Sequence, residues 1–484
     1  MRLSVTSAAS AALALAVVVL GLGCGEGHEH SAPAADVPLT TVEGAPVLVD
    51  ENPNPSIVEV HLTAQITTVD IAGKPIAMRG YNGSVPGPML RAKVGDEVIV
   101  HFKNELPEET TVHWHGLRIP DSMDGSPRLQ APVPPGGEFT YRFKVPEAGS
   151  FWYHPHVRAH TNVEAGLYAP IVISDPTKDP EYDVERYLML DDLLLVNGER
   201  PPPFTQGHPE MMHGRWGNLL LTNGQPSENA GTRAEQGMVE RWRLVNTANG
   251  RTMVLELEGA TFRVIGTDGG LLPQPYTTKR IVLPVGQRYD LEVVYDRPGT
   301  AKLLSMIRAF GPDGKIVEQA WPVFVVDVAA SARAPRTHAW PAIELPNRAP
   351  EAEGTITIDA VAGGEHGVEW RLNGLSHSNE PLFTYNQGQT VKLKLVNKLG
   401  PEHPFHLHGQ FFTVVDPGQP GLKDTVLVPG MGTVEVIAYM DNPGRWMAHC
   451  HILEHAELGM MSEIVVNPAS GPPIGPAPHE GHGH

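Results

Sequence analysis

The sequence has few cysteines and no long basic or helical stretches, and each absence excludes something. Its two cysteines, Cys24 and Cys450, are too few for a disulfide framework. Lysine and arginine form no run, and the formal net charge is -19, which argues against nucleic acid and anionic membrane surfaces as partners. The apolar run at residues 8–22 is too short and too close to the N-terminus to favour a permanent membrane span.

Residues 1–24 are predicted to be an export signal, because Arg2 precedes the apolar run. Cys24 follows Gly21-Leu22-Gly23, which resembles a bacterial lipoprotein processing site. Ala32-Pro33-Ala34 offers an ordinary signal-peptidase site instead, so both alternatives stay open. We expect an exported protein of the periplasm or cell envelope, with a lipid anchor through Cys24 as one alternative. Residues 25–45 are small, polar and proline-containing, which predicts a flexible tether.

Short β-like runs between glycine and proline turns follow from about residue 46, for example Ile57–Leu62 and Glu97–Phe102. No long segment has a helical period, so the pattern predicts an all-β sandwich or barrel. The length of 484 residues suits about three domains.

One strand-like stretch occurs three times, as Gly95–Asn104, Gly237–Asn246 and Gly388–Asn397. In each, the glycine opens the stretch and the asparagine closes it nine residues later. The spacing of about 140–150 residues indicates a repeated domain. We therefore predict three β-sandwich domains at residues 46–175, 176–330 and 354–468, a linker at 331–353 and a disordered, histidine-rich tail at 469–484.

Histidine pairs stand at matched places in the first and third repeats. Each pair lies nine residues after the closing asparagine or five residues after a later glycine. The middle repeat has Leu255, Leu257, Leu304 and Met306 at these places, so it carries no metal ligands. Roughly one His-x-His is expected by chance among 23 histidines in a chain of this length. The four pairs are His113 and His115, His154 and His156, His406 and His408, and His449 and His451.

Both histidines of such a pair point to the same side of a strand, about 6.5 Å apart along the chain. Eight imidazoles are too many for one first-row metal ion and suit a cluster of two or three coppers. The four pairs can share a site only if the first and third domains touch, so the metal should also help to hold these domains together.

Cys450 lies between His449 and His451 and faces away from both if the strand is extended. His403 stands at odd offsets from His406 and His408, so it also faces away from its neighbouring pair. A cysteine and histidines with a weak axial methionine form a blue-copper ligand set, and a buried inert cysteine is the alternative. The first domain has Thr110 and Pro155 at the equivalent places, so only the third domain can build this set, from His403, Cys450, His455 and Met460.

The four His-x-His motifs and the Cys-x4-His-x4-Met loop resemble the three-domain multicopper oxidases of the laccase-like group over residues 46–468. The resemblance implies three cupredoxin-like Greek-key β-sandwich domains and four copper ions. The type 2 copper would be held by His113 and His406, one type 3 copper by His115, His154 and His451, the other by His156, His408 and His449, and the type 1 copper by His403, Cys450 and His455 with Met460 axial.

The resemblance also implies the reaction. A donor gives single electrons to the type 1 copper, electrons cross through Cys450 to His449 and His451, and four electrons reduce dioxygen to two waters. Phenols or aromatic amines are the expected donors, and we expect a monomer. A cuprous oxidase or other metallo-oxidase is an alternative. The only sequence feature that favours it is Met211-Met212-His213, a short methionine-containing motif. A copper-binding or scaffold protein without turnover is less consistent with the complete ligand set, and a copper nitrite reductase would not need eight cluster histidines.

Three acidic residues are candidates for proton handling. Asp124, eleven residues after His113, resembles the family's acid near the type 2 copper, although an aspartate before glycine is also an ordinary turn residue. Several bacterial relatives have a glutamate directly after the type 1 histidine, where this chain has Ala456. Glu454 or Glu457 are the candidates to replace it.

Overall fold

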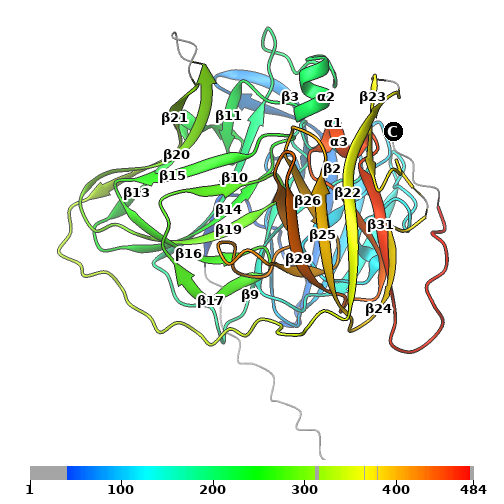
Figure 1. The fold of residues 1–484 in the computed structure, drawn as a ribbon. Helices are drawn as coiled ribbons and strands as arrows, with labels where there is room; N and C mark the ends of the chain where they lie inside the picture. The colour runs from blue at the N-terminus through cyan, green and yellow to red at the C-terminus, as the bar shows by residue number, and fades with distance from the viewer. Residues whose placement is uncertain (1–40, 311–315, 365, 379, 480–484) are drawn as a thin grey trace, which may run out of the picture. The chain divides into compact units, whose positions relative to one another are not determined.

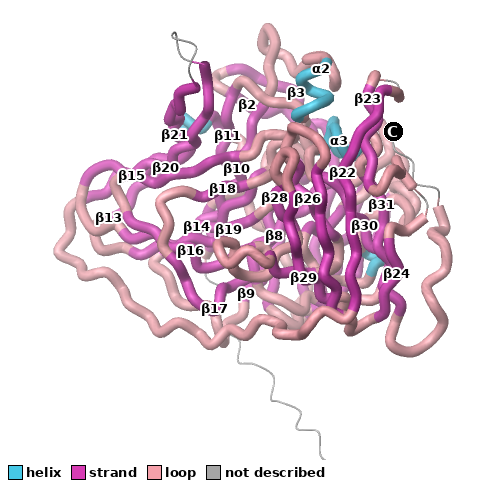
Figure 2. Tube along the Cα trace, viewed as in Figure 1, coloured by secondary structure: helices cyan, strands magenta, loops and turns pink. Residues whose placement is uncertain are grey.

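The computed structural model describes residues 41–310, 316–364, 366–378 and 380–479, and almost all of its regular structure is β-strand (Figure 1, Figure 2). The predicted all-β fold class is therefore confirmed. The described residues contain three short α-helices, and no helix among them could cross a membrane. The helices are α1 (Ala159–Asn162), α2 (His208–His213) and α3 (Leu453–Glu457), with two 3-10 turns at Asp121–Met123 and Ser227–Asn229. The predicted export signal and Cys24 lie outside the described residues.

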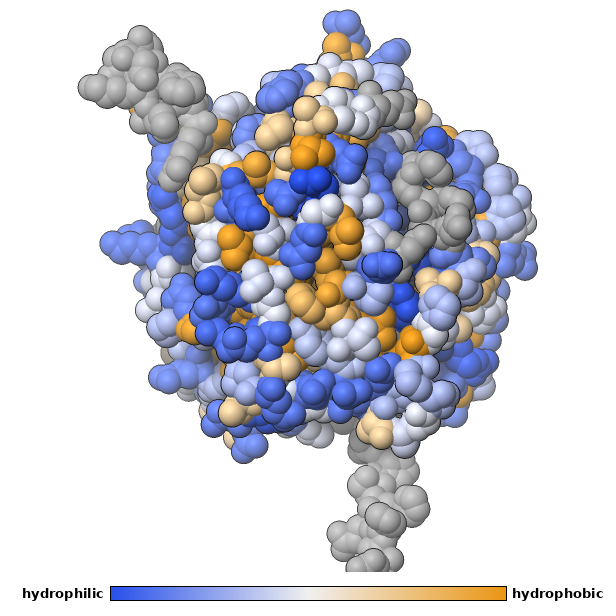
Figure 3. Space-filling view, turned by 45° about the vertical axis from the view of Figure 1, so that its right-hand side comes forward, coloured by the Kyte–Doolittle hydropathy of each residue, from blue (hydrophilic) through white to orange (hydrophobic). Residues whose placement is uncertain are grey.

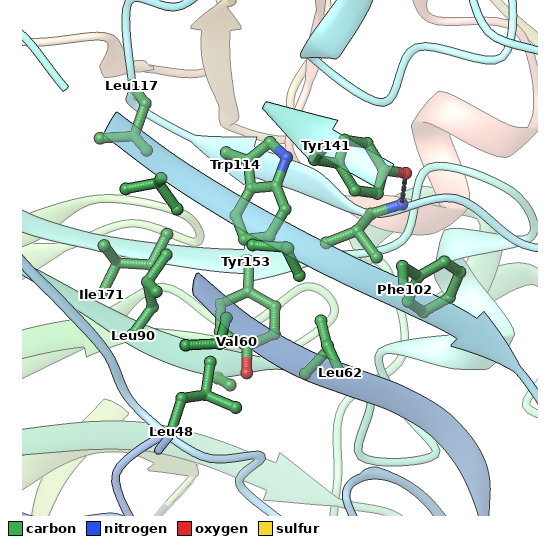
Figure 4. Packing of buried hydrophobic residues seen from close by; sticks show 14 of the residues in the cluster. Leu48, Val60, Leu62, Leu90, Phe102, Trp114, Leu117, Tyr141, Tyr153 and Ile171 are labelled. Atoms are coloured by element: carbon green, nitrogen blue, oxygen red, sulfur yellow. Dashed lines mark hydrogen bonds between the residues drawn. The ribbon is translucent and has the colours of Figure 1, made fainter. Parts of the chain in front are cut away.

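Two four-stranded sheets form the first domain, in the orders β3-β2-β5-β7 and β4-β9-β8-β6. Apolar side chains from both sheets meet in one buried cluster (Figure 4). The strands of the first sheet are β3 (Lys74–Tyr81), β2 (Ile57–Ile71), β5 (Glu97–Asn104) and β7 (Glu138–Lys144). Those of the second are β4 (Leu90–Lys93), β9 (Ala169–Ser174), β8 (Gly149–His154) and β6 (His113–His115).

The middle domain has a larger and a smaller sheet around its own apolar cluster. The larger sheet consists of β12 (Gln225–Pro226), β11 (Leu219–Thr222), β10 (Val184–Leu193), β14 (Val239–Asn246), β19 (Arg288–Val294), β16 (Thr261–Thr267) and β17 (Gly270–Tyr276), with β1 (Val42–Glu43) beside β10. The smaller sheet consists of β13 (Gly231–Glu235), β21 (Ile316–Ala329), β20 (Gly299–Phe310), β15 (Met253–Glu258) and β18 (Ile281–Leu283).

Two five-stranded sheets enclose the apolar cluster of the third domain. One consists of β23 (Val368–Leu372), β22 (Ala352–Ala362), β25 (Thr390–Asn397), β29 (Thr433–Tyr439) and β27 (Phe411–Val414). The other consists of β24 (Phe383–Asn386), β31 (Met461–Asn467), β30 (Gly444–Cys450), β26 (His403–Leu407) and β28 (Thr425–Val428).

All described residues belong to one compact unit. The face of the molecule shown in Figure 3 is mostly hydrophilic, with apolar residues gathered near its centre.

The threefold sequence repeat has a direct structural counterpart. In each domain the repeated strand (β5, β14 or β25) pairs in parallel with an earlier strand and antiparallel with a later one. The closing asparagine makes the same contacts in each domain, because its side-chain amide donates to two backbone carbonyls. Asn104 donates to Glu108 and Val133, Asn246 to Arg251 and Leu283, and Asn397 to Pro401 and Pro429, at 2.7–3.1 Å.

The alternation expected for β6 is visible in the core of the first domain. Trp114, between two of the predicted ligands, points into the apolar cluster near Tyr141 and Tyr153 (Figure 4). The hydroxyl of Tyr141 accepts a hydrogen bond from the backbone of Val112 at 2.9 Å, which fixes the chain just before the strand. His113 and His115 consequently face the opposite side.

Two segments differ from their predicted description. Val42 and Glu43 belong to the predicted tether, yet they form β1 because Val42 is buried and Glu43 pairs with Arg186 of the middle domain. Part of the predicted disordered tail is also held in place. The carbonyl of Gly475 accepts a hydrogen bond from Arg445 at 2.7 Å, and the backbone of His479 donates to Arg128 at 3.2 Å.

Replacing the closing asparagine of the middle domain should destabilise the protein without touching a predicted ligand. Asn246→Ala leaves two carbonyls without their donor, which we expect to cost about 2 kcal/mol and to lower the thermal unfolding midpoint by roughly 2 °C. Asn218→Ala is the matched control, because Asn218 also donates to one backbone group and accepts from another but is exposed. Calorimetry of both variants checks the prediction, and equal midpoints would contradict it.

Candidate metal centre

The eight predicted cluster histidines meet between the first and third domains. Antiparallel pairing places His113 opposite His154 in β6 and β8, and His406 opposite His449 in β26 and β30. Rings from the two domains stack on each other, with centroid distances of 3.9 Å for His115 and His406 and 4.0 Å for His113 and His408. All eight side chains are buried, at 8% exposure or less. The predicted contact between the two domains is therefore confirmed.

The possible ligand atoms fall into small groups in which all atoms lie within 4.8 Å of one another. Two of these groups coincide with the type 3 sets that the resemblance implies, namely His115, His154 and His451, and His156, His408 and His449. The implied type 2 pair, His113 and His406, occurs together with His408. The assignment of one copper to each set stays a prediction.

Hydrogen bonds determine which nitrogen of each imidazole faces the cluster. Four rings donate Nδ1–H to backbone carbonyls at 2.8–3.0 Å, which leaves the Nε2 lone pair for a metal. These donors and acceptors are His113 to Asp124, His154 to Pro155, His406 to Asp424 and His449 to Cys450. His115 is reversed, since its Nε2 lies 3.4 Å from the Asp424 carboxylate and its Nδ1 lies 3.3 Å from Nε2 of His451.

Copper fits the donor set of this cluster. The Nε2 atoms of His113, His154 and His406 are buried and have no hydrogen-bond partner among the described residues. A buried nitrogen without a hydrogen-bond partner lowers the stability of the folded protein by about 1–3 kcal/mol. A bound metal ion would offset this loss by accepting the nitrogen lone pair. Burial, with the neighbouring imidazoles, lowers the pKa of six cluster histidines, so these rings are neutral at pH 7 and can bind metal: His115, His154, His156, His408, His449 and His451.

The cysteine and its two histidines form a second buried group. Sγ of Cys450 lies 3.7 Å from Nδ1 of His403 and 3.7 Å from Nδ1 of His455, and the two nitrogens are 3.1 Å apart. Trp370 stacks on His455 with a centroid distance of 4.1 Å. Burial lowers the pKa of His403 to about 3 and raises that of the Cys450 thiol, so a metal would have to displace the thiol proton. Met460 is buried nearby, and its carbonyl accepts the backbone N–H of Cys450 at 3.1 Å.

Strand β30 connects the two groups. Cys450 faces the core of the third domain, while His449 and His451 face the eight-histidine cluster, as the alternation predicts. The axial role of Met460 stays a prediction.

The three predicted acids lie in different surroundings. Asp124 touches the cluster, because its carboxylate lies 2.7 Å from Nδ1 of His408 and its carbonyl accepts from His113. Glu454 is fully buried and accepts a hydrogen bond from Asn249 of the middle domain at 2.7 Å. Glu457 lies 2.9 Å from Nδ1 of His160 and lines a cavity of about 600 Å³. Burial raises the pKa of Asp124 and of Glu454.

Sequence reasoning missed two residues at the cluster, Asp424 and Arg288. The carbonyl of Asp424 accepts from His406, and Arg288 binds the Asp424 carboxylate through two hydrogen bonds of 2.7 and 2.6 Å. Asp424 mirrors Asp124 but stands 18 residues after its histidine rather than 11, so matching the repeats does not reveal it. Arg288 belongs to the domain that has no ligands, and no signal in the sequence singles it out.

Comparison with known proteins agrees with this geometry. Models of the multicopper oxidase family match residues 63–178, 169–301 and 350–470. Multicopper oxidase MmcO of Mycobacterium tuberculosis is 31% identical over 83% of this chain and 86% of its own length, and Laccase-1 of Botryotinia fuckeliana is 29% identical over 84% and 82%. A solved multicopper oxidase from Campylobacter jejuni, described as a metallo-oxidase, superposes with a TM-score of 0.76 at 27% identity, covering 89% of this chain and 96% of that one.

Asp124→Asn should weaken metal binding at the cluster. The backbone carbonyl that holds His113 remains, but the carboxylate that holds His408 is lost, and loss of such a partner typically lowers metal affinity about 10–100-fold. Competition between the protein and a copper chelator measures this change. Asp191→Asn is the control, since Asp191 is also buried and its carboxylate accepts 2.7 Å hydrogen bonds, from Tyr168 and from the backbone of Asp192, but none from a cluster histidine. Unchanged affinity in Asp124→Asn would contradict the prediction.

Proposed function

The chain belongs to the multicopper oxidase family, and from this premise we propose that it uses four copper ions to couple four one-electron oxidations of a donor to the reduction of dioxygen to two waters. When bound, copper supplies the one-electron redox chemistry that the side chains lack. The observation that supports the proposal best is the pair of buried groups on the two faces of β30. One group has eight imidazoles, and the other has a thiol and two imidazoles.

The residues would divide as the resemblance implies. His113 and His406 would hold the type 2 ion, and the two groups of three histidines would hold the type 3 pair. His403, Cys450 and His455 would hold the type 1 ion, with Met460 as the axial ligand. The covalent path from the Cys450 thiol to either flanking imidazole crosses one peptide bond, so β30 connects the two centres directly.

Reduction of dioxygen consumes protons, and Asp124 is the predicted acid in contact with the cluster. Its carboxylate is buried and touches Nδ1 of His408, so we propose that it orients this ring and holds a proton at the cluster. The contacts of Glu454 and Glu457 are to Asn249 and His160, on the side of α3. Their location supports a role near the type 1 group rather than at the dioxygen cluster.

The cavity beside α3 supports phenols and aromatic amines as donors. Its lining includes Glu457, two residues after His455, together with Phe204 and His366, whose rings stack at 4.1 Å. The Glu457 carboxylate can accept a hydrogen bond from a phenol hydroxyl or an aromatic amine, and the ring can pack against Phe204. The volume of about 600 Å³ suits a small aromatic molecule.

A reduced metal ion such as Cu(I) is the second candidate donor, because α2 brings Met211-Met212-His213 to the type 1 group. Trp370, which stacks on His455, donates its indole N–H to the carbonyl of Met211 at 3.1 Å. Met212 packs against the core of the third domain. Thioether sulfur prefers Cu(I), so this helix could present a cuprous ion near His455.

We also propose export to the periplasm or cell envelope, action as a monomer and, as one alternative, a lipid anchor at Cys24. The support for export is Arg2 followed by the apolar run at residues 8–22.

Copper loading tests the proposed function directly. We expect about four coppers per chain, a strong blue thiolate band and oxygen uptake with a phenol as donor. Cys450→Ser should abolish the blue band and lower the copper count by about one, because serine oxygen does not replace a soft thiolate. One copper per chain without oxygen uptake would contradict the oxidase.

Two variants separate the donor classes. Glu457→Gln should raise KM for a phenol about tenfold and leave Cu(I) oxidation unchanged, because it removes the carboxylate acceptor. Met212→Leu should slow Cu(I) oxidation and leave the phenol unchanged, because leucine keeps the packing but lacks sulfur. Steady-state oxygen uptake with each donor gives both comparisons. If both variants affect both donors equally, neither site binds its donor as proposed.

A further inference from the structure

Arg288 of the middle domain uses all of its five N–H donors at the point where the three domains meet. It is fully buried at the start of β19. Nε donates to the carbonyl of Ser150 in the first domain at 3.1 Å. Nη1 and Nη2 bind both carboxylate oxygens of Asp424 in the third domain, and each also donates at 3.1 Å to a carbonyl of the middle domain, at Gly286 and Asp268.

Asp424, which Arg288 holds, contacts histidines from two domains. Its carbonyl accepts Nδ1–H of His406 at 2.9 Å, and its carboxylate lies 3.4 Å from Nε2 of His115. Thr425 contributes as well, because its hydroxyl donates to the Asp424 carboxylate at 2.9 Å and lies 3.2 Å from Nδ1 of His406. The rings of His115 and His406 stack at 3.9 Å, so Asp424 contacts a pair of facing imidazoles, His406 through its carbonyl and His115 through its carboxylate.

Two glycines show how closely the middle domain approaches the cluster. A Cβ atom on Gly116, directly after His115, would lie 2.4 Å from Nη2 of Arg288 and 2.8 Å from the Asp424 carboxylate. A Cβ atom on Gly286 would lie 2.7 Å from the ring of His451. Both glycines also have a positive φ, +91° and +83°, which glycine adopts without strain. The backbone can therefore pass close to the imidazoles and the guanidinium.

We propose that Arg288 is a positioning residue for the trinuclear copper cluster: it holds Asp424 in place, and thereby orients His406 through the Asp424 carbonyl and His115 through the Asp424 carboxylate. The domain without ligands thus takes part in the site through one side chain. The inference rests on the proposed function, because it assigns these two histidines to copper. Lysine cannot replace arginine here, since an ammonium has three donors and no planar fork for a carboxylate.

Spectroscopy of copper-loaded variants tests the proposal with the type 1 site as an internal reference. In Arg288→Lys we expect the blue band to keep its intensity per chain. The type 2 signal in electron paramagnetic resonance should change its hyperfine splitting or disappear, with cluster copper affinity about 10–100-fold lower. Asp424→Asn should reproduce the same change, because it removes the carboxylate that Arg288 holds.

Arg186→Lys is the matched control, since Arg186 is a buried arginine of the same domain that binds both oxygens of Glu240 and none of the cluster histidines. It should leave both copper signals unchanged. The proposal is overturned if Arg288→Lys and Asp424→Asn keep the wild-type type 2 signal, or if type 1 and type 2 copper fall in parallel, as a general loss of stability would cause. A wild-type protein without any type 2 signal would instead refute the proposed function itself.

Discussion

The structure depends on one constraint: imidazole nitrogens from two domains are buried together without enough hydrogen-bond partners. The Nε2 atoms of His113, His154 and His406 point into a space that the described residues do not satisfy. A buried, unpaired polar atom opposes folding, whereas a metal ion turns the same lone pair into a bond. The contact between the first and third domains and the copper site are therefore one feature, and neither domain can build the cluster alone.

The surrounding carbonyls and carboxylates make the cluster specific. Asp124 and Asp424 are near-symmetric partners, because the carbonyl of each holds the first histidine of a pair, His113 or His406. Their carboxylates face His408 and His115, and each of these two histidines belongs to the domain opposite its acid. Each acid therefore restrains rings on both sides of the domain contact, and these four imidazoles are oriented before any metal binds.

Much of this arrangement could be predicted from the sequence, because strands alternate and the domain repeats. Alternation placed His403 and Cys450 on one face and the two histidine pairs of the third domain on the other, and the repeat identified the middle domain as the one without ligands. The orientation of Glu454 could not be predicted, because it lies on helix α3, where alternation says nothing. The role of Arg288 could not be predicted for another reason. Its partners come from three domains, and no local sequence pattern encodes such a contact.

The three repeats show how one pair of antiparallel strands can carry three different sets of side chains. In the third domain β26 and β30 carry ligands on both faces. In the first domain one face carries histidines, and the place of His403 is taken by Thr110, whose hydroxyl donates to a backbone carbonyl within the buried interior. In the middle domain Leu255 pairs with Ser305, and Leu255 and Leu303 are part of the apolar core. The shared backbone determines which positions can hold a metal ligand, and the residue type at each position determines whether a ligand is present. A strand that separates two faces by one residue, such as β30, is what allows a thiol site and an imidazole cluster to lie back to back.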